Sequence, residues 1–236
     1  MIALKVTQDR KTANFATPNG KGSKIANAFS LPAGRHFSCP GATTFCNGIC
    51  YAGRLEKQYK GFKGVVMHNW ELLKDAEFSA MVILLNAMIV AFEAQCDKWD
   101  APKKFRIHAD GDFFNMEYTR AWARVIRIHP NVHFWAYTRS DFAAEYLHAE
   151  GFSNLGLYFS ADTVNLPVAL AMEAKGIRLA MVDTTFDKAK ESVKGVRCPE
   201  QNSKAFALIN ENGGACVRCN LCPMARGNVL FSVTKK

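Results

Sequence analysis

The chain has 236 residues, of which 49% are hydrophobic and 22% are charged, as in a soluble globular protein with one sizeable core. The most apolar stretch, residues 81–92, is about a dozen residues long, whereas a membrane span needs roughly 18. The N-terminal residues contain no apolar signal-peptide segment. The composition thus argues against a membrane-spanning or secreted protein and predicts a cytoplasmic one.

The formal net charge is +9, and basic residues gather in two places. One group spans residues 54–63; the other lies near the N-terminus and consists of Lys5, Arg10, Lys11, Lys21 and Lys24. A positive surface attracts polyanions, so contact with DNA, RNA or a nucleotide is one prediction. The alternative is a soluble protein with an ordinary positive excess on its surface.

Strand and helix patterns alternate along most of the chain. Residues 28–31 predict a strand that leads into a loop with three cysteines, and residues 64–99 show a long helical pattern broken near residues 74–78. Further strands are predicted at residues 103–109, 132–138, 155–160 and 177–182. Helices are predicted at residues 116–128, 140–148, 166–175 and 186–193, with Asn115 and Gly176 as end residues of two of them.

Strands alternating with helices predict parallel βαβ units. We therefore expect an α/β fold built as a partial or complete parallel β/α barrel, with a doubly wound open sheet as the alternative. Three regions are expected: a basic irregular segment (residues 1–27), a β/α core that includes the three-cysteine loop (residues 28–197), and a cysteine-rich metal-binding extension (residues 198–236).

Seven of the eight cysteines fall into two groups, which we interpret as metal sites because a reducing cytoplasm keeps thiols free. The first group is Cys39, Cys46 and Cys50, and the second is Cys198, Cys216, Cys219 and Cys222. Cys96 stands alone in a helical pattern and is expected to be a small buried apolar residue.

The four cysteines of the extension, with one remote and three closely spaced, favour a [4Fe–4S] cluster. A structural tetrahedral zinc ion on the same four thiolates is the alternative. The three cysteines of the first group leave the fourth metal position open, as catalysis requires. His36 lies three residues before Cys39, and its ligation would close that site and suit zinc.

Polar residues follow the predicted strands, where parallel α/β folds place their chemistry. They are Asp110, Gly111 and Asp112 after one strand, Arg139 after the next, Ser160 and Asp162 after the next, and Asp183 after the last. Each residue alone is expected to cap the following helix. Taken together, beside a thiolate loop, they predict a site.

The three-cysteine loop, with Tyr51 beside Cys50, resembles a spaced-out form of the radical S-adenosylmethionine (SAM) cysteine motif. The resemblance implies a [4Fe–4S] cluster whose open iron chelates SAM, and a reductant protein as partner. It implies that residues 110–112 hold the SAM amino group and that Ser160 and Asp162 contact its ribose. Arg139 and Asp183 would then face the substrate, and the tail cysteines would form an auxiliary cluster.

The segments CPGATTFCNGICYAG, FRIHADGDFF and FWAYTRS, together with the tail CxxCxxC, also resemble a phage family called gene product 88. This resemblance implies a viral or prophage origin, a place in the host cytoplasm, and nucleic-acid modification as one role. It implies no particular activity.

Two other functions compete with a radical enzyme. The first is a non-catalytic nucleic-acid-binding protein with structural zinc or iron–sulfur sites, in which Phe113 and Phe114 are exposed for base stacking. Trp135 and Tyr137 are further stacking candidates, although Trp135 is expected in the core. The second is a metal-dependent hydrolase that uses His108, Asp110 and Asp112.

Overall fold

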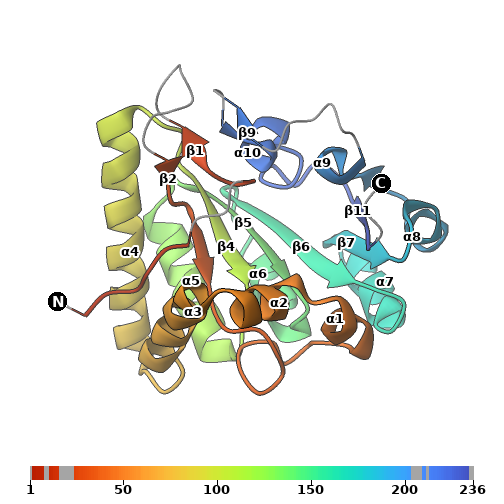
Figure 1. The fold of residues 1–236 in the computed structure, drawn as a ribbon, viewed down its shortest axis with the longest axis horizontal. Coiled ribbons are helices and arrows are strands. Elements are labelled where there is room, and N and C mark those ends of the chain that lie inside the picture. Colours follow the sequence, from red (N-terminus) through yellow and green to blue (C-terminus); the bar gives the residue numbers. More distant parts are fainter. Residues whose placement is uncertain (1, 8–10, 16–23, 203–208, 211–212, 234–236) are drawn as a thin grey trace.

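The fold is built on a seven-stranded sheet in which every pairing is parallel (Figure 1). The computed structural model describes residues 2–7, 11–15, 24–202, 209–210 and 213–233. In sheet order the strands are β3 (Ala28–Ser30), β4 (Lys104–Asp110), β5 (His133–Thr138), β6 (Leu155–Ala161), β7 (Arg178–Asp183), β11 (Val229–Ser232) and β8 (Val196–Arg197). The expected mixed α/β fold with a parallel sheet is confirmed.

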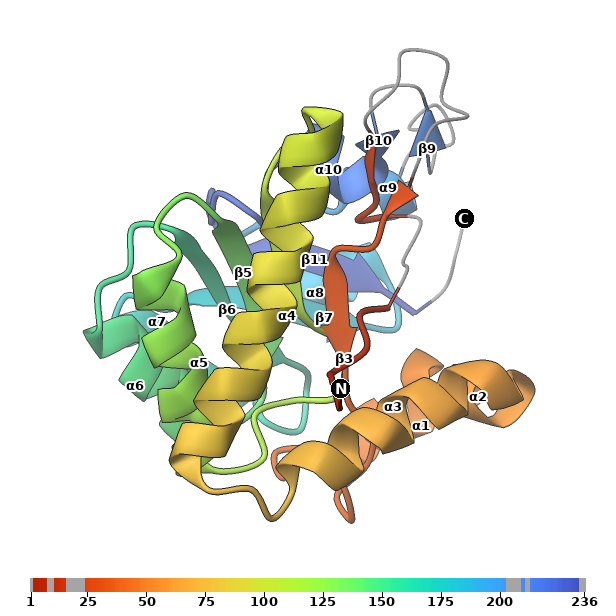
Figure 2. The same cartoon turned by 90° about the vertical axis from the view of Figure 1, so that its left-hand side faces the viewer.

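The order from β3 to β7 follows the chain without reversal, and a helix connects each successive pair of strands. These helices are α4 (Phe78–Trp99), α5 (Met116–Ile128), α6 (Asp141–Ala149) and α7 (Leu166–Ala174), and α8 (Phe186–Ser192) follows β7. Right-handed crossovers between successive neighbours put all their helices on one face of the sheet. Figure 2 shows α5, α6 and α7 together on that face.

The main core lies between these helices and one face of the sheet. Phe105, Ile107 and Phe134 pack there against Trp122 and Val125 of α5, and all five are buried. The opposite face carries the alternate residues, as the two-residue period of a strand requires. A smaller cluster of Tyr158, Ala180 and Val229 lies on that second face, with Tyr137 and Phe231 packed against it.

Helix α4 has 22 residues and an 18-residue window of mean hydropathy 1.7, so by length and composition it could cross a membrane. The sequence pattern predicted a shorter apolar stretch. Met81, Leu85 and Phe92 of this helix are buried in the main core. One such helix is weak evidence for a membrane span, because the core helix of a soluble protein passes the same test.

The two cysteine groups lie at opposite ends of the sheet, lower and upper in Figures 1 and 2. The lower end holds α1 (Thr44–Ile49), α2 (Tyr51–Gln58) and α3 (Lys60–Leu73), and the upper end holds α9 (Pro199–Asn202) and α10 (Ala215–Cys219). Part of the segment predicted as a loop is thus helical, because the Thr43 side chain caps α1 by accepting from the Cys46 N–H. Short strand pairs join β1 (Asn14–Phe15) to β2 (Lys24–Ile25) and β9 (Ile209–Asn210) to β10 (Gly213–Gly214).

Both terminal regions contribute to the packed fold. Leu4 and Ile25 belong to the main core, and the Thr7 N–H donates to the Ala28 carbonyl over 2.6 Å. At the other end, β11 lies between β7 and β8 of the main sheet. The cysteine-rich extension therefore supplies a strand of the sheet as well as cysteines.

The extension packs tightly against β6 at Gly156. A Cβ atom there would be 2.6 Å from the Cys222 carbonyl oxygen and closer still to that of Pro223. We expect Gly156→Ala to lower the free energy of unfolding by about 1–3 kcal/mol, as overpacking does, and to loosen the extension. Urea denaturation measures the first effect and limited proteolysis the second.

The matched control is Gly48→Ala in α1, where nothing lies within 4 Å of the added carbon. This change should leave stability unchanged or raise it, because alanine favours helix over glycine. Equal stability of the two variants would contradict the close packing at Gly156.

Candidate metal centres

The three-cysteine segment is fastened to the carboxyl ends of the central strands. The Thr43 hydroxyl donates to Asp162 Oδ2 over 2.6 Å and accepts from the Cys46 N–H over 2.9 Å. Gly41 packs so closely against the Arg139 carbonyl that a side-chain carbon would overlap it. The start of α1 is thereby held against the ends of β5 and β6.

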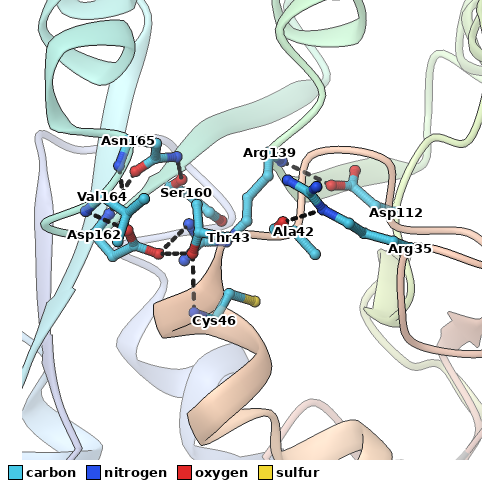
Figure 3. A network of polar contacts seen from close by, with 10 residues as sticks. All are labelled: Arg35, Ala42, Thr43, Cys46, Asp112, Arg139, Ser160, Asp162, Val164 and Asn165. Carbon is cyan, nitrogen blue, oxygen red and sulfur yellow. Dashed lines mark hydrogen bonds and ion pairs between the residues drawn. The ribbon is translucent and has the colours of Figure 1, made fainter.

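A buried ion pair completes this attachment (Figure 3). Arg139 Nη1 lies 2.6 Å from Asp162 Oδ2, and the two side chains are only 10% and 0% exposed. Asp162 Oδ1 accepts further hydrogen bonds from the backbone N–H groups of Val164 and Asn165. Every oxygen of the Asp162 carboxylate therefore has a protein donor, and one of the two oxygens reaches the cysteine segment through Thr43.

Asp112 holds the neighbouring strand end in a similar way. Its carboxylate accepts from the Thr138 hydroxyl over 2.6 Å and from the backbone N–H groups of Phe113 and Arg139, each over 2.7 Å. Burial raises the pKa of Asp112 to about 6, although these three hydrogen bonds oppose the shift. Asp112 thus links the ends of β4 and β5 next to the cysteines.

The Cys46 thiol lies within electrostatic reach of both Cys39 and Cys50 at this edge. Burial, together with the nearby Asp112 carboxylate, raises the pKa of Cys39 to about 12. Burial also raises the pKa of Cys46, while the Arg139 guanidinium lowers it. Cys50 sits between α1 and α2, where its sulfur accepts from the Gly53 N–H over 3.4 Å. The Arg139 charge favours a thiolate at Cys46.

Other predicted site residues lie along the same edge. Gly111 has φ +86°, and a Cβ there would be 2.6 Å from Ser38 Oγ, so glycine lets the cysteine segment approach β4. Asp110 is buried at the end of β4, and Ser160 is half-buried on β6. Asp183 is buried at the end of β7, where its carboxylate accepts from the Thr184 N–H. The edge therefore gathers the strand-end residues that the sequence singled out.

His108 does not join the two aspartates. Its backbone has φ +59°, and the pairing advances by two positions along β3 but by four along β4 at this point, which marks a bulge. The ring is buried against Phe29 and Phe113, and Nε2 lies 2.9 Å from the Tyr118 hydroxyl. Burial lowers the pKa of His108 to about 3. The expected His108–Asp110–Asp112 hydrolase site is therefore wrong in its histidine, which faces the core.

The four cysteines of the extension line one pocket. Cys198, Cys216, Cys219 and Cys222 surround it, together with apolar neighbours that include Leu221 and Val229. Burial, together with the neighbouring Cys198 and Cys219, raises the pKa of Cys222 to about 11. The influence of Cys198 and Cys219 on Cys222 agrees with the four thiols meeting in one pocket, although Cys198 and Cys222 are 24 positions apart in the sequence.

The donor sets of both groups fit soft metals. Four thiols around a single pocket match a [4Fe–4S] cluster or a tetrahedral zinc ion, and three thiols match a cluster with an open iron. Within the described ranges, however, no three histidine, cysteine or carboxylate side chains, His36 included, are drawn together tightly enough to hold a metal ion. Both groups must therefore close around any metal that they bind, as when metal binding is coupled to folding.

Comparison with known proteins identifies the family. The model of the family described as gene product 88 matches residues 2–224. The chain belongs to this family. The gene 88 proteins of Mycobacterium phages L5 and D29 are each 54% identical to it over 240 residues, across the full length of both chains. No solved structure matches it significantly. The expected phage relationship is confirmed, whereas none of these matches connects the chain to radical SAM enzymes.

Two of the four expected stacking aromatics are buried. Phe113 is fully buried, which corrects its expected exposure, and Trp135 is buried as its strand pattern suggested. Phe114 stacks on Tyr118 with ring centroids 4.4 Å apart, and Tyr137 packs on the second face of the sheet. Phe113 and Trp135 are therefore closed to bases, whereas the rings of Phe114 and Tyr137 are only partly buried.

The N-terminal basic residues give little support to a phosphate-binding segment. Lys5 is exposed, and Lys11 forms an ion pair with Glu200 at 2.8 Å. Arg10 and Lys21 lie outside the described residues, as does the side chain of Lys24.

Metal binding by the extension should depend steeply on pH. Burial holds Cys222 and Cys198 as neutral thiols, because it raises the pKa of both, and a metal must displace their protons. We expect the apparent Co²⁺ affinity to rise between about pH 6 and 8, by about tenfold per pH unit for each thiol that ionises. Thiolate-to-cobalt absorbance measures it, with Cys96→Ala as control. An affinity independent of pH would contradict proton displacement.

Removing the Asp162 carboxylate should be costly. Asp162→Ala leaves the Arg139 charge buried without its partner and removes the acceptor of the Thr43 hydroxyl. We expect a loss of about 3–5 kcal/mol in the free energy of unfolding, measured by urea denaturation. The control is Asp187→Ala, which breaks the more exposed pair with Arg197 and should change stability far less. Similar losses in both variants would contradict a special role for the buried pair.

Proposed function

We propose that the chain is an iron–sulfur enzyme in which Cys39, Cys46 and Cys50 hold a [4Fe–4S] cluster with an open iron for SAM. The observation that carries this proposal is the attachment of the cysteine segment, through Thr43, Asp162 and Arg139, to the carboxyl edge of a parallel sheet. Parallel α/β folds place their reactions at that edge.

The order of the strands supports a partial β/α barrel. A doubly wound sheet reverses its strand order near the middle and so places helices on both faces. Here the order from β3 to β7 runs without reversal, and α5, α6 and α7 share one face (Figure 2). The opposite face is partly covered by Leu221, Cys222 and Ala225 of the extension, and we assign its remainder to a substrate.

When bound, the cluster would supply an electron and a coordination position for SAM. The protein residues act around it. Since Asp112 and Asp162 already accept several protein hydrogen bonds, we assign both to holding the cysteine segment in place. Asp110, Gly111 and Ser160 remain the proposed SAM contacts, while Arg139 favours the Cys46 thiolate.

The four-cysteine pocket is proposed to hold an auxiliary [4Fe–4S] cluster, with zinc as the alternative metal. It covers the amino ends of the central strands: the Pro223 carbonyl accepts from the His133 ring over 2.8 Å at the start of β5. Such a site closes the end of the sheet opposite the SAM edge. A reductant protein would supply electrons from outside.

The proposal predicts about eight iron atoms in each anaerobically purified chain, four for each cluster. Electron paramagnetic resonance of the dithionite-reduced protein should change when SAM is added, and 5′-deoxyadenosine should accumulate slowly. Cys50→Ala should abolish both effects and leave the tail cluster in place. Cys96→Ala should preserve both, because Cys96 is buried in the main core, to which none of the seven grouped cysteines belongs.

Two results would count against the proposal. Stoichiometric zinc with no iron after anaerobic preparation would favour a protein with structural metals. A SAM-independent spectrum without cleavage product would remove the radical-enzyme assignment while keeping the clusters.

A further inference from the structure

The exposed residues of α2 and of the start of α3 are strongly basic and include two aromatic rings. We call this basic surface the α2–α3 face, and it consists of Tyr51, Arg54, Lys57, Tyr59, Lys60 and Lys63. The four basic residues are all exposed, and none forms an ion pair within the part of the chain that the structure describes. Figures 1 and 2 show α2 and α3 following one another along the lower end of the fold.

The charge on this face is almost unopposed. Glu56 is the single carboxylate between residues 51 and 70. Its Oε1 accepts from the Ala33 N–H over 2.8 Å, which directs it toward the cysteine segment. Four positive charges therefore face solvent with one negative charge beside them, an arrangement that attracts a polyanion.

The two tyrosines add flat apolar surface to the positive charge. Tyr51 is 55% exposed and Tyr59 is 52% exposed. The Tyr51 hydroxyl donates to the Ala109 carbonyl in β4, so its ring is held while remaining open to solvent. Exposed aromatic rings beside basic residues are the pattern with which proteins bind single strands, because bases stack on the rings and phosphates meet the cations.

We propose that the α2–α3 face binds single-stranded nucleic acid, with phosphates on Arg54, Lys57, Lys60 and Lys63 and bases on Tyr51 and Tyr59. Tyr51 directly follows Cys50 and is tied to a central strand, so a bound strand leads to the three-cysteine edge. That the strand is also a substrate rests on the proposed function, whereas the binding itself does not.

Fluorescence anisotropy with a labelled oligonucleotide tests the binding. The full chain, purified anaerobically, is titrated with single-stranded DNA, single-stranded RNA and a DNA duplex at several salt concentrations. Lys57→Glu with Lys60→Glu should weaken single-strand binding at least tenfold and reduce the salt slope by about 0.7 for each lost phosphate contact. The control pair, Lys188→Glu with Lys190→Glu on α8, makes the same charge change and should stay within about twofold of the parent.

A second pair of variants tests stacking. Tyr59→Ala should weaken single-strand binding about tenfold, while Tyr59→Phe, which keeps the ring, should bind like the parent. The two single-stranded arms decide between DNA and RNA. Absence of binding, equal losses in both lysine pairs, or equal affinity for the duplex would overturn the proposal. If the chain binds no oligonucleotide but its spectrum still changes with SAM, the nucleic-acid proposal fails while the proposed function stands.

Discussion

The buried pair of Arg139 and Asp162 is the interaction on which the candidate site depends. Taking both charges out of water is costly, and the cost is offset only because each oxygen of the carboxylate is also hydrogen-bonded. The same carboxylate positions Thr43, which in turn caps α1 by accepting from the Cys46 N–H. One charge pair therefore joins two strand ends to the cysteine segment and sets the electrostatic surroundings of a thiol.

Much of the fold could be predicted from sequence because its elements are strongly periodic. Residues 116–128 form a helix capped by the Asn115 side chain, as expected, and Gly176 takes the positive φ that closes another. The long pattern of residues 64–99 breaks where predicted, between α3 and α4. Here local signals and long-range packing agree.

The remaining features depend on distant contacts that leave no local pattern. Helix α1 buries none of its residues and begins because Asp162 orients Thr43 from 119 positions away. Strand β11 has four residues, which is too few to show the two-residue alternation of a strand in the sequence. It is stabilised by pairing with β7 on one side and β8 on the other. The bulge at His108 turns a residue of a regular-looking strand pattern toward the core. At the site, the sequence pattern predicted which residues gather but assigned Asp112 and Asp162 to SAM binding. In the structure, the hydrogen bonds of these two carboxylates hold the strand ends and the cysteine segment in place.

The place of β11 in the sheet also sets an order of assembly. In the described residues β8 pairs with β11 alone, and the chain between them, residues 198–228, carries all four cysteines of the extension. During synthesis this edge of the sheet stays open until residues 229–232 have left the ribosome, long after β3 to β7 can pair. A metal on the four thiolates would shorten the loop that must close, which lowers its entropic cost. Supply of metal to the newly made chain would then govern how fast its last strand enters the sheet.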